Sequence, residues 1–136
     1  MPVRFLDTNI LVRYFTQDDT AKAEKALALL RRIERGDERV ETSLLVIFET
    51  VYTLQRFYRV PKPQIQELML PVLNLRGLRL PLKTLCVDAL ALFVKYDISF
   101  ADAFNAAYLQ ARGMTEIYSW DTDFDKIEGI ARLEPD

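Results

Sequence analysis

The sequence predicts an α/β protein with a mainly parallel sheet of four to five short strands, covered by helices on both faces. Short runs with strand character alternate with longer runs whose apolar residues recur at helical spacing. Strands separated by helices usually pair in parallel and lie buried between helical layers. No linker, repeat or low-complexity segment divides the 136 residues. We therefore expect a single domain over residues 1–136 with one core.

The first half of the chain shows clear signals for where helices begin and end. Apolar Ala26, Leu27, Leu30 and Ile33 recur at helical spacing, and Gly36 is a plausible stop. Ser43 can cap a following helix that the segment 59–63, RVPKP, breaks. We expect strands over 3–7 and 39–43, and helices over 8–15, 18–37 and 43–58.

The second half continues the same alternation. A helix is expected to start after Pro63, and Pro71 inside it predicts a kink or an early break. Ser99 and Asp102 have the spacing of a capping box, with Gly113 at the exit of that helix. We expect helices over 64–75, 83–96 and 99–113, strands over 78–81, 115–120 and 131–135, and a turn with a short helix over 121–127.

Composition narrows the classes of function. Half the residues are hydrophobic and 28% are charged, as in ordinary globular proteins, and uninterrupted apolar runs such as 44–48 are far too short to span a membrane. No leader-like segment opens the sequence, so we expect a cytoplasmic protein with no membrane contact. The net charge of −2 and pI near 5.3 argue against a globally basic nucleic-acid binder, but not against a nuclease with local Lys and Arg.

The chain contains no histidine and a single cysteine. Cys86 cannot form an internal disulfide, and we expect it to be a small core residue. The absence of histidine removes the usual general base and the commonest metal ligand. Any metal site must therefore use oxygen ligands, which suit Mg²⁺ or Mn²⁺ better than Zn²⁺.

Two aspartates follow predicted strands directly. Asp7 ends the first strand, inside VRFLDTNILV, and Asp121 comes after EIYSW. An unpaired buried carboxylate is costly, so Asp7 should lie at an exposed strand end or have a partner. Ligands bind beyond the carboxyl ends of parallel strands, so both acids are expected at the ligand-binding edge of the sheet. Asp7 and Asp121, each taken alone, could simply cap the next helix. Asp123 is an alternative to Asp121 as the site residue after this strand, whereas Asp125 should face solvent.

Two helices contribute further acids. Glu49 lies on or beside the apolar stripe of its helix, although its carboxylate could reach water at the edge of that stripe. Asp102 falls in the first turn of its helix, where capping alone would explain it, but Asn105 lies one turn further on the same side. Two strand ends and two helices could thus converge on one acidic pocket.

Such a pocket would need positive charge. Two carboxylates about 4 Å apart repel by roughly 4 kcal/mol at an effective dielectric constant near 20. Divalent cations remove that cost, and a pair of them roughly 3.5 to 4 Å apart is an established device for cleaving phosphodiesters. The acid set therefore predicts metal-dependent phosphodiester chemistry.

Four segments together resemble the PIN-domain ribonucleases, specifically VapC-like toxins of type II toxin-antitoxin systems. They span nearly the whole chain in the family's order. LDTN alone would be a weak signal, whereas the set of four is fairly specific. The segments are FLDTNILVRYFTQDD, VIFETVYTL with its Glu, SFADAFNAA and YSWDTDFDKI.

This resemblance implies a three-layer α/β/α sandwich and an endoribonuclease that needs Mg²⁺ or Mn²⁺. It also implies a homodimer that a cognate antitoxin holds inactive and that cleaves RNA when free. Asn9 and Ser119 match small polar positions that orient ligands or water, and Asp123 could share or replace the role of Asp121. The acids matched to the catalytic and metal-binding positions are Asp7, Glu49, Asp102 and Asp121.

Two other readings remain open at this point. A catalytically inactive PIN-like module would use the same acids to bind a partner, although the presence of all four counts against it. A receiver-like phosphoacceptor domain also places an Asp at a strand end. That domain would need an acidic pair near the first strand and a Lys after a late strand, and neither is found.

Overall fold

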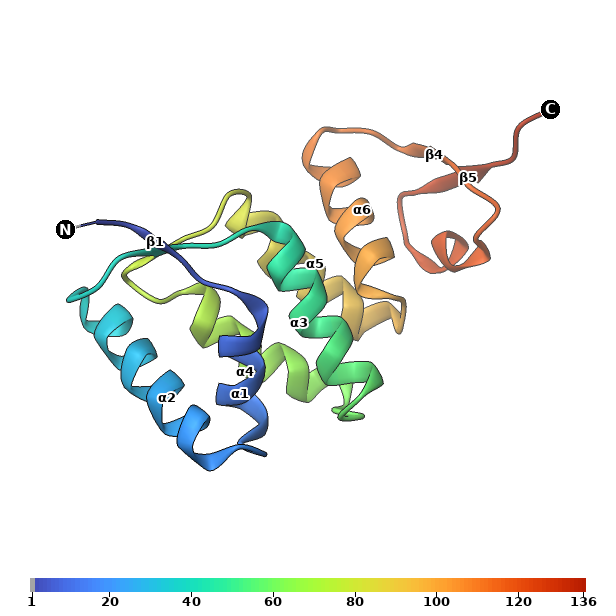
Figure 1. The fold of residues 1–136 in the computed structure, drawn as a ribbon. Coiled ribbons are helices and arrows are strands. Elements are labelled where there is room, and N and C mark those ends of the chain that lie inside the picture. The colour runs from blue at the N-terminus through green and yellow to red at the C-terminus, as the bar shows by residue number, and fades with distance from the viewer. Residues whose placement is uncertain (1) are drawn as a thin grey trace. The chain divides into compact units, whose positions relative to one another are not determined.

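The computed structural model describes residues 2–136. This part of the chain forms two compact units, one running to Lys83 and the other from Thr84 to Asp136. Short parallel strands and helices alternate in both, as the sequence predicts (Figure 1).

The first unit contains a three-stranded parallel sheet in the order β1 (Arg4–Phe5), β2 (Val40–Glu41) and β3 (Leu78–Arg79). Arg4 pairs with Val40, which in turn pairs with Leu78. Beyond the end of β1, the buried Thr42 hydroxyl donates a 2.8 Å hydrogen bond to the Leu6 carbonyl. This bond fixes the chain immediately before Asp7, so the end of β1 is held in place.

Four helices pack with this sheet: α1 (Thr8–Thr16), α2 (Thr20–Arg35), α3 (Leu44–Arg56) and α4 (Lys62–Leu73). Helix α1 contacts α2 and α3, and α3 contacts α4 (Figure 1). The predicted stripe of α2 is confirmed, because Ala26, Leu30 and Ile33 are buried and Leu27 is half-buried. One buried cluster joins strands and helices: Leu6, Leu11, Leu30, Ile33, Val40, Val46 and Val72.

The predicted helix ends mostly hold. The Ser43 hydroxyl accepts a hydrogen bond from the Val46 N–H at 3.3 Å, and Gly36 ends α2 in the left-handed conformation with φ of 81°. The predicted start of α4 was wrong, because α4 begins at Lys62 rather than after Pro63. A proline in the first turn costs nothing, since the N–H it lacks would have no partner inside the helix. Helix α4 also continues past Pro71 and ends at Leu73.

The second unit contains α5 (Lys83–Tyr96) from its second residue onward, α6 (Phe100–Ala111), β4 (Glu116–Tyr118), the 3-10 helix η1 (Thr122–Lys126) and β5 (Ala131–Leu133). Strands β4 and β5 pair in parallel, with Tyr118 opposite Leu133. Helix η1, between these strands in the sequence, contacts both β5 and α6. The second unit therefore brings the end of β4 and the start of η1 close to α6.

Two smaller predictions are also tested. Cys86 is buried in α5, and burial raises the pKa of its thiol to about 11, as expected for a core residue. Across residues 2–136, every helix is too short or too polar to cross a lipid bilayer.

Gly77, just before β3, tests how tightly this sheet is packed. A Cβ atom there would lie 2.9 Å from the Ile33 carbonyl oxygen and closer still to that of Glu38. Because backbone atoms cannot move aside cheaply, we predict that Gly77→Ala lowers the free energy of unfolding by about 3 kcal/mol in urea denaturation.

Gly113→Ala is the matched control for Gly77→Ala. Gly113 has φ of +69°, but among the described residues no atom lies within 4 Å of the added Cβ. Only backbone strain of about 1 kcal/mol should result. Equal costs at the two glycines would contradict the close packing at Gly77.

Candidate active site

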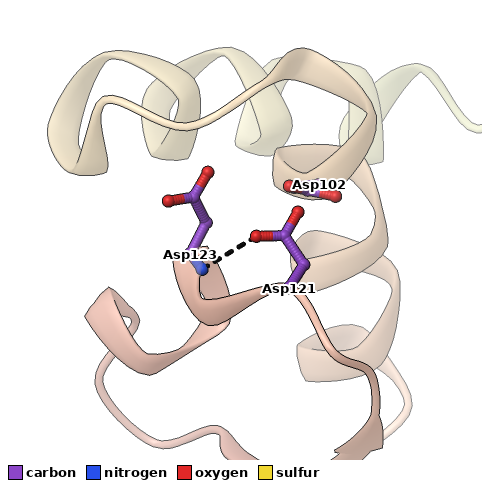
Figure 2. A group of neighbouring side chains, drawn as sticks. All are labelled: Asp102, Asp121 and Asp123. Carbon is purple, nitrogen blue, oxygen red and sulfur yellow. Dashed lines mark hydrogen bonds between the residues drawn. The ribbon is translucent and has the colours of Figure 1, made fainter.

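Three aspartates of the second unit form an acidic cluster. Asp102, Asp121 and Asp123 each present a carboxylate oxygen, and these oxygens all lie within 4.8 Å of one another. Figure 2 shows the three side chains gathered between α6 and η1. Two of the predicted site residues, Asp102 and Asp121, are thus brought together, and Asp123 joins them.

The first turn of α6 positions Asp102. The Ser99 hydroxyl accepts a 3.1 Å hydrogen bond from the Asp102 backbone N–H and so caps the helix. The next residues, Ala103 and Phe104, are buried and fix the rotation of this turn. The Ser99 side chain also hydrogen-bonds the Asp102 carboxylate, which therefore interacts with both the cap and the cluster.

Two successive turns at the end of β4 position Asp121. The Ser119 hydroxyl accepts a 2.9 Å hydrogen bond from the Asp121 N–H. The Asp121 carboxylate then accepts a 2.9 Å hydrogen bond from the Asp123 N–H and caps η1, as the dashed line in Figure 2 shows. The predicted capping role of Asp121 is therefore confirmed, and it coexists with membership of the cluster.

Basic residues reach the neighbouring acids of this turn. Lys126 forms a 3.0 Å ion pair with Asp123, so the Asp123 carboxylate is shared between that ammonium and the cluster. Arg132 pairs with Asp125 at 3.1 Å and also donates to the Ser119 carbonyl at 3.0 Å. Asp125 is exposed, as predicted.

The cluster changes the acidity of two of its members in opposite directions. Partial burial raises the pKa of Asp102 to about 6, and a hydrogen bond with Asp121 and repulsion from its charge add to this. The pKa of Asp121 is held below its usual range by the N–H of Asp123, then by the hydrogen bond from Asp102. Below about pH 6 the two carboxyl groups thus share a proton, with Asp102 as its main carrier.

The first unit holds the other predicted acids. Asp7 is exposed at the end of β1 and precedes α1, but among residues 2–136 its side chain makes no capping hydrogen bond. The capping explanation is therefore wrong for Asp7. Glu49 is exposed on α3, between half-buried Phe48 and buried Thr50, so it lies at the edge of the buried face. Asn9 is exposed in the first turn of α1.

A cavity of about 480 Å³ between α1 and α2 was not anticipated from the sequence. Ile10 and Leu29 line it together with several cations, which the spacing of residues 22, 25 and 32 along α2 could have indicated. Neighbouring acids offset much of this charge, since Arg13 pairs with Asp18 at 2.9 Å and Arg32 with Glu38 at 3.2 Å. The cations are Arg13, Lys22, Lys25 and Arg32.

The chain is similar to known proteins over nearly its whole length. The chain is 24% identical over 133 residues to the VapC ribonuclease of Aquifex aeolicus, which covers 98% of this chain and 97% of the relative. It also matches the crystal structure of VapC20 from Mycobacterium tuberculosis, a Sarcin-Ricin loop cleaving toxin. That match has 22% identity, a TM-score of 0.40, and coverage of 98% of this chain and 100% of the other. The family model for the PIN domain matches residues 4–130. The chain therefore belongs to the PIN-domain family.

Proposed function

We propose that this protein is a divalent-metal-dependent endoribonuclease that acts as the toxin of a toxin-antitoxin pair. The observation that carries the proposal is the cluster of Asp102, Asp121 and Asp123 in a PIN-domain chain. The relative from Aquifex aeolicus is described as a VapC ribonuclease, which supports RNA as the substrate.

The donor set of the cluster fits a hard divalent cation. All its ligand atoms are carboxylate oxygens, and three of them lie within 4.8 Å of one another. Oxygen ligands of this kind suit Mg²⁺ and Mn²⁺. When bound, such an ion supplies positive charge that offsets the acids and stabilises negative charge developing on a scissile phosphate.

The chain's own residues take distinct roles in this proposal. Asp102 and Asp121 are the principal ligands, and Asp123 shares or replaces the role of Asp121. Asp7 serves as a further ligand, and Glu49 as a ligand or as the base that orients water. Ser119, which holds the Asp121 backbone at 2.9 Å, and Asn9 orient ligands or water.

The proposed partners follow from the same assignment. An RNA is the substrate, a cognate antitoxin is the inhibitor, and a second copy of the chain completes a homodimer in the cytoplasm. The same acids in a non-catalytic module would instead bind a partner without cleaving RNA, so a nuclease assay on antitoxin-free protein separates these two functions.

Neutralising single acids tests the catalytic assignment. We predict that Asp7→Asn, Asp102→Asn and Asp121→Asn each reduce Mg²⁺- or Mn²⁺-dependent RNA cleavage by at least about a hundredfold, because loss of a direct ligand should cost no less than loss of a supporting residue. Circular dichroism should show that the fold is retained. Asp88→Asn, a change at an exposed acid on α5, is the matched control and should cleave RNA normally.

Unchanged cleavage by Asp7→Asn would remove that residue from the active site. If the wild-type protein, freed of any antitoxin, leaves RNA intact at all Mn²⁺ concentrations, the endoribonuclease assignment fails and the partner-binding function takes its place.

Thermal unfolding tests metal binding without any RNA. An ion that binds only the folded protein stabilises it by about 2.7 kcal/mol at a hundred times its Kd, so Mn²⁺ should raise the midpoint of the wild type by several degrees. Asp102→Asn should abolish this shift, whereas Asp88→Asn should keep it. Comparing Asp121→Asn with Asp123→Asn identifies the more important ligand as the variant with the smaller shift. A full shift in Asp102→Asn would exclude the cluster as the metal site.

The raised pKa of Asp102 predicts how stability depends on pH in metal-free protein. Its folded-state pKa of about 6 lies above that of an unfolded aspartate, so the folded state is favoured at low pH and loses this advantage as pH rises from about 4 to about 6. Asp102→Asn cannot lose a proton, so its stability relative to the wild type should increase over that window. Above it the gain levels off at about 1 kcal/mol, since solvent screens this partly exposed group. A difference between the two proteins that stays constant from pH 4 to 7 would contradict the shared proton.

A further inference from the structure

The residue between Ser119 and Asp121 is the only tryptophan of the chain. The Trp120 side chain is 72% exposed, although tryptophan is usually one of the more buried residues on average. Among residues 2–136 the structure gives its indole no hydrogen bond, ring contact or cation-π partner. The residue that directly precedes Asp121 of the acidic cluster thus carries a large, flat, exposed ring.

The backbone on both sides of Trp120 is firmly held. On one side, the Ser119 N–H donates to the Leu133 carbonyl at 3.0 Å, and the Ser119 carbonyl accepts from Arg132 at 3.0 Å. On the other side, Asp121 is tied to the Ser119 hydroxyl and to Asp123. Trp120 is the middle residue of the turn that the Ser119 hydroxyl closes. The exposed side chain therefore belongs to an ordered turn, and its backbone is fixed directly before Asp121 of the cluster.

Because the protein has a net negative charge, a contact with RNA that does not depend on charge would add to its affinity. The net charge is −2, and the nearby Lys126 and Arg132 are already paired with acids, so apart from a bound cation the electrostatic attraction to phosphates is weak around this site. Stacking of a base on an aromatic ring does not depend on charge in this way, and every base offers a flat face to it. Unpaired bases of single-stranded or looped RNA are the ones free to stack on protein side chains.

We propose that Trp120 is a positioning residue on which an unpaired base of the RNA substrate stacks, holding the adjoining phosphate at the acidic cluster. This inference rests on the proposed endoribonuclease function and deepens it. It defines the substrate as RNA with an unpaired base next to the cleaved bond, and it places no restriction on which base that is.

The single tryptophan allows a direct test that does not need catalysis. With EDTA present to prevent cleavage, we expect a single-stranded RNA oligonucleotide to quench the tryptophan fluorescence of the wild-type protein in a saturable way. The same sequence in a perfect duplex should quench it far less. Asp121→Asn, which is expected to be inactive, should still show the quenching by single-stranded RNA.

Steady-state cleavage of a single-stranded substrate supplies the second test. Trp120→Leu keeps an apolar side chain but removes the aromatic ring, so KM should rise roughly fivefold or more while kcat changes little. Trp120→Phe restores a ring and should recover most of the affinity. Phe57→Leu changes a similarly exposed aromatic at the end of α3 and is the matched control, with no change in KM expected. All these variants should keep the Mn²⁺-induced thermal shift.

Three results would overturn the role of Trp120 without touching the proposed function. They are an unchanged KM in Trp120→Leu, no quenching by single-stranded RNA, and equal quenching by single-stranded and duplex RNA. The proposed function fails in a different way, since it would show as absence of cleavage and of the Mn²⁺ shift in the wild type. The fluorescence measurement needs neither RNA cleavage nor bound Mn²⁺. It therefore reports on Trp120 whether or not the proposed function holds.

Discussion

The second unit holds three carboxylates close together despite their mutual repulsion. Asp102, Asp121 and Asp123 place oxygens within 4.8 Å of one another, and like charges at such separations are unfavourable without compensation. The protein alone compensates only in part, through an ion pair from Lys126 to Asp123 and, below about pH 6, a proton held mainly by Asp102. A bound divalent cation would complete the neutralisation, which explains why the same geometry favours both proton sharing and metal binding.

Local hydrogen bonds between serine hydroxyls and backbone N–H groups, together with the buried Ala103 and Phe104, set the positions of these acids. Ser99 caps α6 and fixes Asp102, while Ser119 closes the turn that fixes Asp121. Arg132 ties the same turn to β5 through the Ser119 carbonyl. The two serine hydroxyls that position the acids carry no charge of their own. Such support lets a cluster of like charges persist in a folded protein, and Trp120 gains its exposed, fixed position from the same turn.

The sequence was sufficient for most helices because their ends carry strong local signals. Ser43, Gly36 and Ser99 all act at helix ends as predicted, and α5 has the predicted bounds of 83–96. The strands are shorter than predicted, because a residue counts as strand only where its neighbour pairs with it, and strand propensity does not encode where pairing stops. The predicted start of α4 was wrong because a helix was expected only after Pro63, whereas a proline in the first turn is compatible with a helix.

The acidic site was predictable only in part. The strand-end argument singled out Asp121, whereas the place of Asp102 in a first turn was explained equally well by capping, and the structure brings both acids into one cluster. No sequence pattern distinguishes Asp121 from Asp123, because their difference lies in which carboxylate caps η1 and which pairs with Lys126. The roles of Asp7 and Glu49 stay predictions, with both side chains exposed in the first unit. The exposure of Trp120 depends on the turn closed by Ser119, which residue type alone does not reveal.

The central claim is that the carboxylates of α6 and η1 form a divalent-cation site, and anomalous diffraction from crystals grown with Mn²⁺ examines it most directly. We predict an anomalous peak in contact with carboxylate oxygens of both Asp102 and Asp121. Strong peaks confined to other parts of the molecule, with none in contact with these two carboxylates, would contradict the account.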